Sequence, residues 1–151
     1  MKTNSLSPVD PNYAARVRDS FQHQKLMRWI GAELSGLAPG QCVIRLPCRP
    51  ELTQQDGYIH AGIVGTIGDT AAGYAAYTLM PHDAGVLTIE YKMNLVAPAV
   101  GESLVARGEV LRAGRTLVVA RADVFALKSG AETLCASLLQ TLMTMHGKGK
   151  R

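Results

Sequence analysis

The stretch AGIVGTIGDTAAGYAAYTLMP, residues 61–81, decides the fold of this chain of 151 residues. It is apolar and rich in small residues, and its one charged side chain, Asp69, stands near its middle. The stretch is long enough to raise the question of a membrane span, but Asp69 and four glycines lower its hydropathy. The pattern therefore predicts a helix that is buried inside a globular domain.

The glycines of this stretch have a regular spacing. Gly62, Gly65 and Gly68 recur at every third residue, which places them along one side of a helix. A side without Cβ atoms lets a sheet or a partner backbone come close. Because glycine lowers helix propensity, we expect close packing to offset that loss.

Asp69 is the best candidate for a functional residue. Burying an ionised carboxylate without a partner costs much free energy, so a chain that keeps one among Gly, Ala, Ile and Thr has a use for it. The alternative is a structural Asp that caps a helix or pairs with a distant Arg.

Upstream of this stretch, residues 13–34 carry apolar side chains at helical spacing and predict an amphipathic helix. Gly36, Pro39 and Gly40 are expected to end it. Residues 41–46 then alternate as in a short strand, and the polar segment 47–60 predicts a loop that leads to the buried helix.

Downstream of Pro81 the apolar residues recur with period two. From residue 86 to 97 the odd positions are apolar and the even positions, which include Thr88, are polar, so we expect one buried and one solvated face. Three more strands are predicted at residues 102–111, 115–127 and 132–145, with turns at 99–101, 113–114 and 129–130.

The element order is helix, strand, buried helix and then four strands, which we interpret as an antiparallel meander. This order predicts an α+β fold in which a curled antiparallel sheet wraps around a central apolar helix. We expect an N-terminal segment with an amphipathic helix at residues 1–38, one main domain at 39–146 and a basic tail at 147–151.

The composition excludes several classes of protein. Hydrophobic residues make up 47% and charged residues 19% of the chain, which argues against disorder. The N-terminal MKTNSLSPVDPN has no apolar run after its Lys, so we expect a cytoplasmic protein without a secretory signal. The three cysteines and four histidines show no metal-ligand spacing, and we expect neither a metal nor another cofactor.

The net charge of +4 favours an anionic partner. The Arg residues are not clustered with aromatic residues, so the sequence gives no sign of nucleic-acid binding, and we expect no membrane binding either. An anionic small ligand suits the charge.

Three motifs together resemble one known family. They are QQDGYIHAGIVGTIGDTAAGYAA at 54–76, GVLTIEYKMNLVAPAVGE at 85–102 and RAGRTLVVARADVF at 112–125. From Gly40 to about Met145 the chain resembles the hotdog-fold acyl-CoA thioesterases of the phenylacetate-degradation (PaaI) type. That family has Asn or Gln in the loop, His-Gly-Gly at the start of the helix and Asp further along. Gln54, His60-Ala61-Gly62 and Asp69 match this pattern, with Ala61 in place of the usual first Gly.

The resemblance implies the hydrolysis of an acyl-CoA or aryl-CoA thioester. Asp69 would act as general base on water or attack the carbonyl itself, and the backbone N–H of Ala61 would stabilise the oxyanion. Gln54 would orient the thioester or the water, and Thr88 would hold the water. His60 would fix the entrance of the helix or lie against the thioester.

The substrate-binding residues are also implied by the resemblance. Gly62 lies beside the oxyanion donor, and Tyr58 and Tyr91 are candidates for the wall of the acyl pocket. The Gly114-Arg115 turn is the candidate site for the phosphates of coenzyme A. Tyr58 has an alternative role in packing under the loop, and Arg115 has one on the solvated surface.

Members of this family form dimers with shared active sites, so the resemblance implies a homodimer or a homotetramer. Asp69 and Thr88 would come from one chain, and Gln54, His60 and Ala61 from the other. An open edge strand in a sheet of this kind is an independent reason to expect pairing.

Two other functions remain open at this point. A non-catalytic hotdog domain could bind an acyl group or coenzyme A, but it would not need a carboxylate at position 69. A hydratase or dehydratase on the same fold would pair a His with an acidic residue, as His60 and Asp69 could do, but the Gln-containing loop and the Gly-Arg turn fit a thioesterase better.

Overall fold

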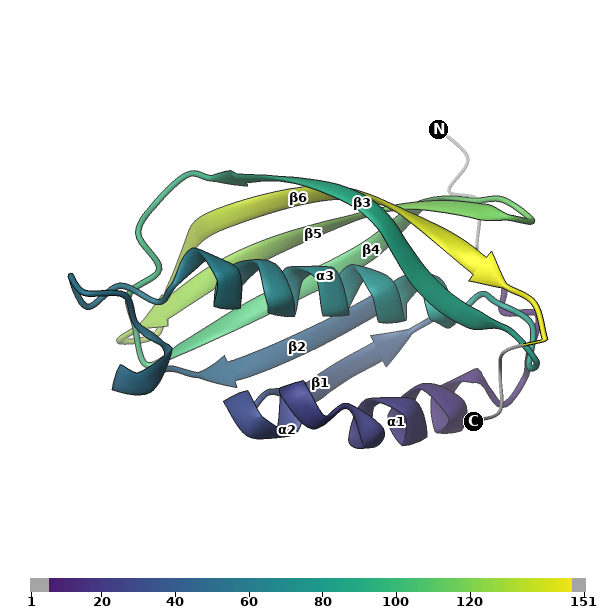
Figure 1. Cartoon of the computed structure of the whole chain (residues 1–151), viewed down its shortest axis with the longest axis horizontal. Helices are drawn as coiled ribbons and strands as arrows, with labels where there is room; N and C mark the ends of the chain where they lie inside the picture. The colour runs from purple at the N-terminus through teal and green to yellow at the C-terminus, as the bar shows by residue number, and fades with distance from the viewer. Residues whose placement is uncertain (1–5, 148–151) are drawn as a thin grey trace.

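One long helix lies in the hollow of a six-stranded antiparallel sheet that curls around it (Figure 1). The computed structural model describes residues 6–147, so the predicted basic tail lies outside the described residues except for Gly147. The enclosed helix is α3 (Ala61–Tyr77), which coincides with the apolar stretch of the sequence. The predicted α+β architecture is confirmed.

The remaining elements surround α3. Two helices, α1 (Tyr13–His23) and α2 (Lys25–Ile30), precede the sheet, and a short 3-10 helix, η1 (Pro50–Leu52), lies in the loop before α3. The strands are β1 (Glu33–Ala38), β2 (Gln41–Pro47), β3 (Gly85–Leu95), β4 (Ser103–Ala113), β5 (Leu117–Lys128) and β6 (Ala131–Met145).

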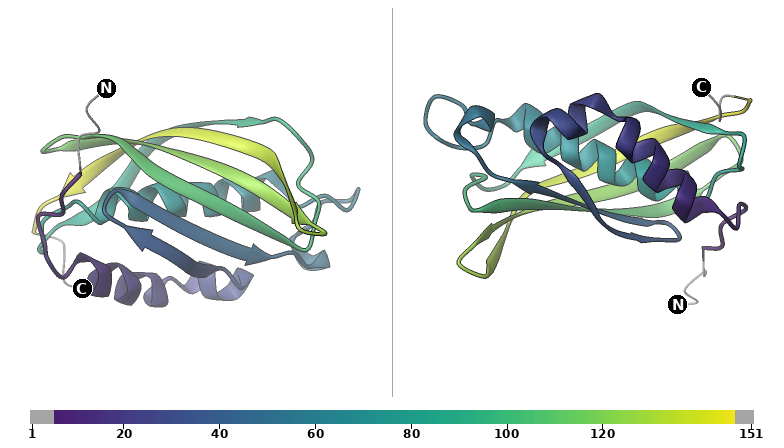
Figure 2. Two further views of the ribbon diagram at one scale, coloured as in Figure 1. Left: turned by 180° about the vertical axis from the view of Figure 1, so that it is seen from behind. Right: turned by 90° about the horizontal axis from the view of Figure 1, so that it is seen from below.

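The N-terminal helix is shorter than its sequence pattern predicts. The prediction of one helix up to Leu34 is wrong. Gln24 is extended, with ψ of 103°, and separates α1 from α2, and Gly31 takes a left-handed conformation with φ of 81° and ends α2. Leu34 belongs instead to β1, and Pro39-Gly40 is the tight turn between β1 and β2. Seen from below, α1 and α2 lie in front of α3 (Figure 2).

The four C-terminal strands do not form a simple meander. Their order in the sheet is β1-β2-β4-β5-β6-β3, so only β4, β5 and β6 follow one another, and β3 pairs with β6 at the far edge. The prediction failed here because period-two alternation shows that a strand exists but not which strand it pairs with. This arrangement places β2 and β3 on opposite sides of α3 (Figure 1).

A β-bulge at Ile89 changes which residues of β3 face inward. The register passes from Thr88 opposite Leu142 to Glu90 opposite Thr141, so Ile89 is the extra residue. Thr88 therefore faces α3, and Leu87 points outward with 51% of its surface exposed. The prediction that the odd positions form the buried face is thus wrong for the first part of the strand.

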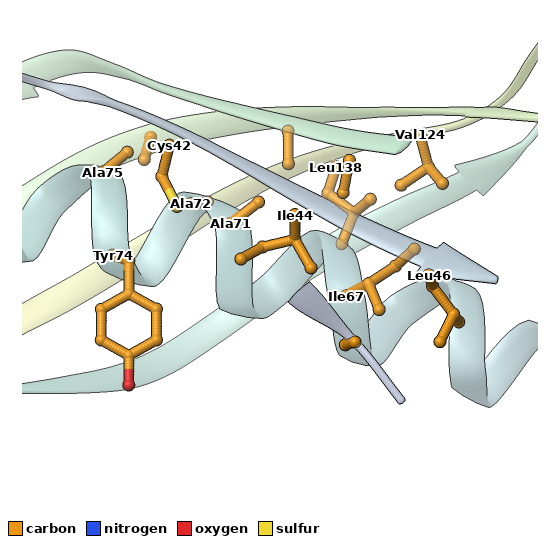
Figure 3. Close-up of a cluster of buried hydrophobic side chains, with 14 of the residues drawn as sticks. Cys42, Ile44, Leu46, Ile67, Ala71, Ala72, Tyr74, Ala75, Val124 and Leu138 are labelled. Atoms are coloured by element: carbon orange, nitrogen blue, oxygen red, sulfur yellow. The ribbon is translucent and has the colours of Figure 1, made fainter. Parts of the chain in front are cut away.

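The core is built from small side chains on α3 and larger ones on the sheet. Figure 3 shows Ile44 and Leu46 of β2 lying against Ile67 and Ala71 of α3. The backbones of α3 and of the sheet come close to each other at a glycine of the sheet. A Cβ atom on Gly108 of β4 would lie 2.3 Å from the carbonyl carbon and oxygen of Ala71.

The glycines of α3 have different surroundings. A Cβ on Gly68 would come within 2.7 Å of the Leu138 side chain, and one on Gly65 within 3.3 Å of the Tyr91 hydroxyl, so both allow close packing as expected. Gly62 is exposed, and a Cβ there would meet only the His60 ring. The predicted glycine stripe therefore packs against the sheet at two of its three positions.

The C-terminal end of α3 is held by a cation from α1. The Arg16 guanidinium donates hydrogen bonds to the backbone carbonyls of Tyr77, Met80 and Pro81 at 3.1, 2.8 and 2.6 Å. It also forms an ion pair at 3.0 Å with the buried Asp10. A positive charge at this end complements the helix dipole and satisfies carbonyls that lack partners within the helix.

We expect the substitution Gly108→Ala to lower the free energy of unfolding by about 2 kcal/mol or more, because the added methyl would overlap the α3 backbone. Gly73→Ala is the matched control. A Cβ there would meet its nearest neighbour, Leu142, at 3.8 Å, and the gain in helix propensity should stabilise the protein by about 0.5–1 kcal/mol. Chemical unfolding of both variants measures these changes. Equal stability of the two would contradict the close helix–sheet approach.

Candidate active site

A cavity of about 490 Å³ lies between α1, the middle of α3 and the start of β3. Asp69 and Thr88 are in its wall. The α1 side of the wall is polar and consists of Arg16, Asp19, Ser20, His23 and Gln24.

The Asp69 carboxylate is half-buried in this wall, whereas its sequence context suggested full burial. Its Oδ1 atom accepts two hydrogen bonds, from the Thr88 hydroxyl at 2.7 Å and from the Gln140 amide Nε2 at 3.0 Å. Within residues 6–147 no donor contacts Oδ2. One oxygen is thus held in place while the other remains available for chemistry.

The N-terminal end of α3 presents one free backbone donor. His60 is the N-cap residue, and its Nδ1 accepts the N–H of Gly62 at 2.9 Å. The N–H of Ile63 donates to the His60 carbonyl at 2.9 Å. The N–H of Ala61 has no acceptor among the described residues, so it can serve as an oxyanion donor.

The loop before α3 forms a tight turn. The Gln54 N–H donates to the Tyr58 carbonyl at 2.8 Å, and Gly57 at φ of 83° supports the reversal of the chain. The Gln54 side-chain oxygen accepts the N–H of Asp56. Gln54, Tyr58 and Ala61 line a second cavity of about 420 Å³.

The predicted catalytic residues therefore form two groups within one chain. Ala61 and Asp69 are eight residues apart on α3, which corresponds to about 12 Å along the helix axis. Thr88 lies with Asp69 in the first cavity, and Gln54 lies with Ala61 in the second. His60 and Gly62 open onto a third hollow together with Trp29 of α2. None of these three cavities, all within residues 6–147, contains all of them.

The predicted substrate-binding residues are also spread out. Tyr91 of β3 is 47% exposed, and its hydroxyl faces Gly65 of α3. The exposed Gly114 and Arg115 lie in the β4–β5 turn, at the C-terminal end of α3 (Figure 1). Close packing also explains why position 114 is a glycine, because a Cβ there would lie 2.6 Å from the Leu117 carbonyl oxygen.

Two features of the site were missed by the sequence reasoning. Gln140 of β6 contacts Asp69. In the sequence it is the polar residue midway between the inward-facing Leu138 and Leu142, and this pattern could have marked it as a candidate. The other is a cluster at the cavity wall in which Tyr74 of α3 contacts α1. Its hydroxyl accepts a hydrogen bond from Gln24 at 2.9 Å and lies 3.2 Å from the Ser20 hydroxyl. Figure 3 shows Tyr74 pointing away from β2.

Across residues 6–147, no group of three or more His, Cys, Asp or Glu side chains is placed to hold a metal ion. No helix in this range is both long enough and apolar enough to cross a membrane. The three cysteines are free thiols, of which Cys42 and Cys135 are buried.

Comparison with known proteins identifies the family. The model of the Thioesterase superfamily matches residues 56–133. An inferred esterase of Halobacterium salinarum is 31% identical over 116 residues, which cover 74% of this chain and 76% of that protein. The structure of a thioesterase family protein from Silicibacter pomeroyi is 47% identical with a TM-score of 0.88, and covers 89% of this chain and 99% of that one. The chain belongs to the thioesterase superfamily.

The fold is also that of the PaaI protein from the phenylacetic acid degradation operon of E. coli. That structure has a TM-score of 0.81 at 13% identity and covers 91% of this chain and 96% of that one. At this identity the similarity shows the fold alone. The family and the esterase relative together support an enzyme that hydrolyses esters or thioesters.

The Tyr74 cluster gives a test in alkaline solution. Burial raises the pKa of the Tyr74 hydroxyl above its ordinary value of 10.0, although the hydrogen bonds with Ser20 and Gln24 partly oppose this. The raised pKa contributes stability that is fully present below pH 10.0 and is lost as the pH rises through the folded-state pKa. We expect the free energy of unfolding to fall as the pH rises above 10.0, and to fall less steeply in Tyr74→Phe.

Chemical unfolding on both sides of pH 10.0 measures the two slopes. Burial also raises the pKa of the Cys42 thiol to about 12, but that thiol is present in both proteins and cancels in the comparison. Identical slopes for the wild type and Tyr74→Phe would contradict the prediction.

Proposed function

We propose that the protein is an acyl-CoA thioesterase that hydrolyses the thioester bond of an acyl-CoA or aryl-CoA. The observation that carries this proposal is the Asp69 carboxylate, which is fixed through Oδ1 by Thr88 and Gln140 at the wall of the 490 Å³ cavity. A domain that only binds an acyl group does not need a carboxylate held in this way. The family supports ester or thioester hydrolysis, and the substrate class is our proposal.

Thioester hydrolysis requires a base or nucleophile at the carbonyl carbon and a donor for the developing oxyanion. The Oδ2 atom of Asp69 suits the first role, either by taking a proton from water or by attacking the carbonyl. Thr88 holds the carboxylate from one side, and in this proposal its hydroxyl also contacts the attacking water. The free N–H of Ala61 suits the second role, because it lies at the positive end of the α3 dipole.

Ala61 cannot reach the thioester that Asp69 of the same chain attacks, since about 12 Å of helix separates them. We therefore propose that the site is completed by a second copy of the chain. A two-fold axis perpendicular to β3 makes the two α3 helices antiparallel, so that Ala61, His60 and Gln54 of one chain approach Asp69 of the other.

The edge strand β3 supports this dimer. It lies at one end of the sheet, and its Leu87, Ile89 and Leu95 side chains are 51%, 47% and 54% exposed. An open edge with exposed apolar residues is expected to pair with another chain. Pairing of two such dimers would give a homotetramer.

In this arrangement Arg115 is a candidate for the coenzyme A phosphates. The β4–β5 turn lies at the C-terminal end of α3, which the antiparallel dimer brings close to the N-terminal end of the partner's α3 (Figure 1). The net charge of +4 favours the same anionic ligand.

The polar α1 wall of the cavity disfavours a long alkyl chain. A long alkyl chain would bury its methylene groups against Asp19, Ser20 and Gln24. It would exclude water from the polar atoms of these three side chains and offer them no hydrogen bonds in return. We expect aryl and short acyl groups to be the better substrates.

The experiment that tests the function is the release of free thiol from aryl, short, medium and long acyl-CoAs by the wild type and by Asp69→Asn. We expect hydrolysis by the wild type, and a loss of at least about 100-fold in kcat in folded Asp69→Asn, because the base or nucleophile is removed. We expect kcat/KM for the long-chain substrate to be at least about tenfold lower than for the best aryl substrate. A wild type that turned over none of these substrates would favour a non-catalytic acyl-binding domain instead.

The oxyanion donor can be removed by Ala61→Pro. Proline lacks the N–H but is tolerated at the first position of a helix, and His60 at φ of −59° and ψ of 137° already has a conformation that precedes proline readily. We expect kcat to fall by about 10²–10³-fold in a folded protein. Ala61→Gly, which keeps the N–H, is the matched control and should retain most of the activity.

Mixing two inactive variants tests whether the site is shared. When Asp69→Asn and Ala61→Pro are unfolded together and refolded, mixed dimers contain one intact site, so the mixture should recover up to about a quarter of the wild-type activity. Each variant refolded alone provides the baseline. A mixture no more active than this baseline would show that the two residues do not act across an interface.

A further inference from the structure

Gln140 stands at an unusual position in β6. Its inward-facing neighbours on the strand are Leu138 and Leu142, which are 1% and 0% exposed, and Gln140 itself is 1% exposed. An apolar residue would continue this face of the sheet against α3. The chain instead has an amide at the one inward position of β6 that contacts Asp69.

Among the described residues, only the nitrogen of this amide forms hydrogen bonds. Nε2 lies 3.0 Å from Asp69 Oδ1, 3.4 Å from the Thr88 hydroxyl and 3.4 Å from the Asp69 backbone carbonyl. Oε1 is buried and has no hydrogen-bond partner among the described residues. A buried acceptor without a partner destabilises a fold, so stability alone does not account for Gln140.

The geometry points to a functional role: we propose that Gln140 is a positioning residue that orients the Asp69 carboxylate for thioester hydrolysis. Gln140 and Thr88 both bind Oδ1, one from β6 and one from β3, and together they limit rotation of the carboxylate about its terminal bond. Oδ2 is thereby directed to the cavity and kept free of competing donors. This inference rests on the proposed thioesterase function and adds a residue to it.

The test compares Gln140→Met with the wild type on the best acyl-CoA substrate. Methionine has nearly the same length and fills the same space, but it cannot donate a hydrogen bond. We expect kcat to fall about ten- to a hundredfold while KM changes by less than about threefold, because the carboxylate is misplaced and substrate binding is not affected. Leu138→Met places the same new side chain on the same buried face and should keep kcat within about twofold.

A second variant separates positioning from a packing effect. Gln140→Asn keeps an amide but is one methylene too short to reach Oδ1, so kcat should fall in this variant as well, with KM again changed by less than about threefold.

The outcomes distinguish this inference from the proposed function. If the wild type hydrolyses thioesters, Asp69→Asn does not and folded Gln140→Met retains the wild-type kcat, the positioning role is wrong and the function stands. A KM that rises together with the fall in kcat, or a lowered kcat in Leu138→Met, would assign the effect to packing and would also overturn the inference. Failure of the wild type itself would instead overturn the proposed function.

Discussion

The enclosure of one helix by one sheet is the constraint on which the rest of this structure depends. The backbone of α3 and the backbone of β4 meet at Ala71 and Gly108, where a Cβ atom on the glycine would lie 2.3 Å from the helix. This approach is possible only because position 108 carries no Cβ and α3 has small residues where its turns face the sheet. The glycines of α3 lower its helix propensity, and burial on nearly all sides offsets that loss. A helix fixed so closely can hold a catalytic group with little freedom to move.

The position of Asp69 follows from that enclosure together with one irregularity in the sheet. The bulge at Ile89 turns Thr88 toward α3 and leaves Leu87 on the outer surface. Without the extra residue, Thr88 would share the outward face with the polar residues that follow it. The bulge thus provides a donor for Asp69 and exposes apolar surface at the edge of the sheet. The proposed dimer would use that edge, so one local feature connects the Asp69 carboxylate with the proposed assembly.

The N-terminal helices do more than cover the sheet, because they also form part of the candidate site. Arg16 holds the end of α3 through three backbone carbonyls, and the buried Asp10 balances its charge. Other α1 side chains form the polar wall of the cavity that contains Asp69. The hydrogen bonds of Ser20 and Gln24 with Tyr74 join this wall to α3. Part of the wall of this cavity therefore comes from a segment of the chain outside the motifs that define the family resemblance.

The sequence by itself determined the elements whose signal is local. The apolar stretch predicted α3, the period-two segments predicted the C-terminal strands, and the isolation of Asp69 marked it as a candidate, because helical and strand periodicities are carried by neighbouring residues. Only the tertiary structure decided the strand order, the inward turn of Thr88 and the meeting of Gln140 with Asp69, which lie 71 residues apart. The end of α2 at Gly31 was also missed, since the apolar spacing continues into β1. Strand pairing and side-chain contacts across the core depend on interactions between distant segments, and these leave no periodic pattern in the chain.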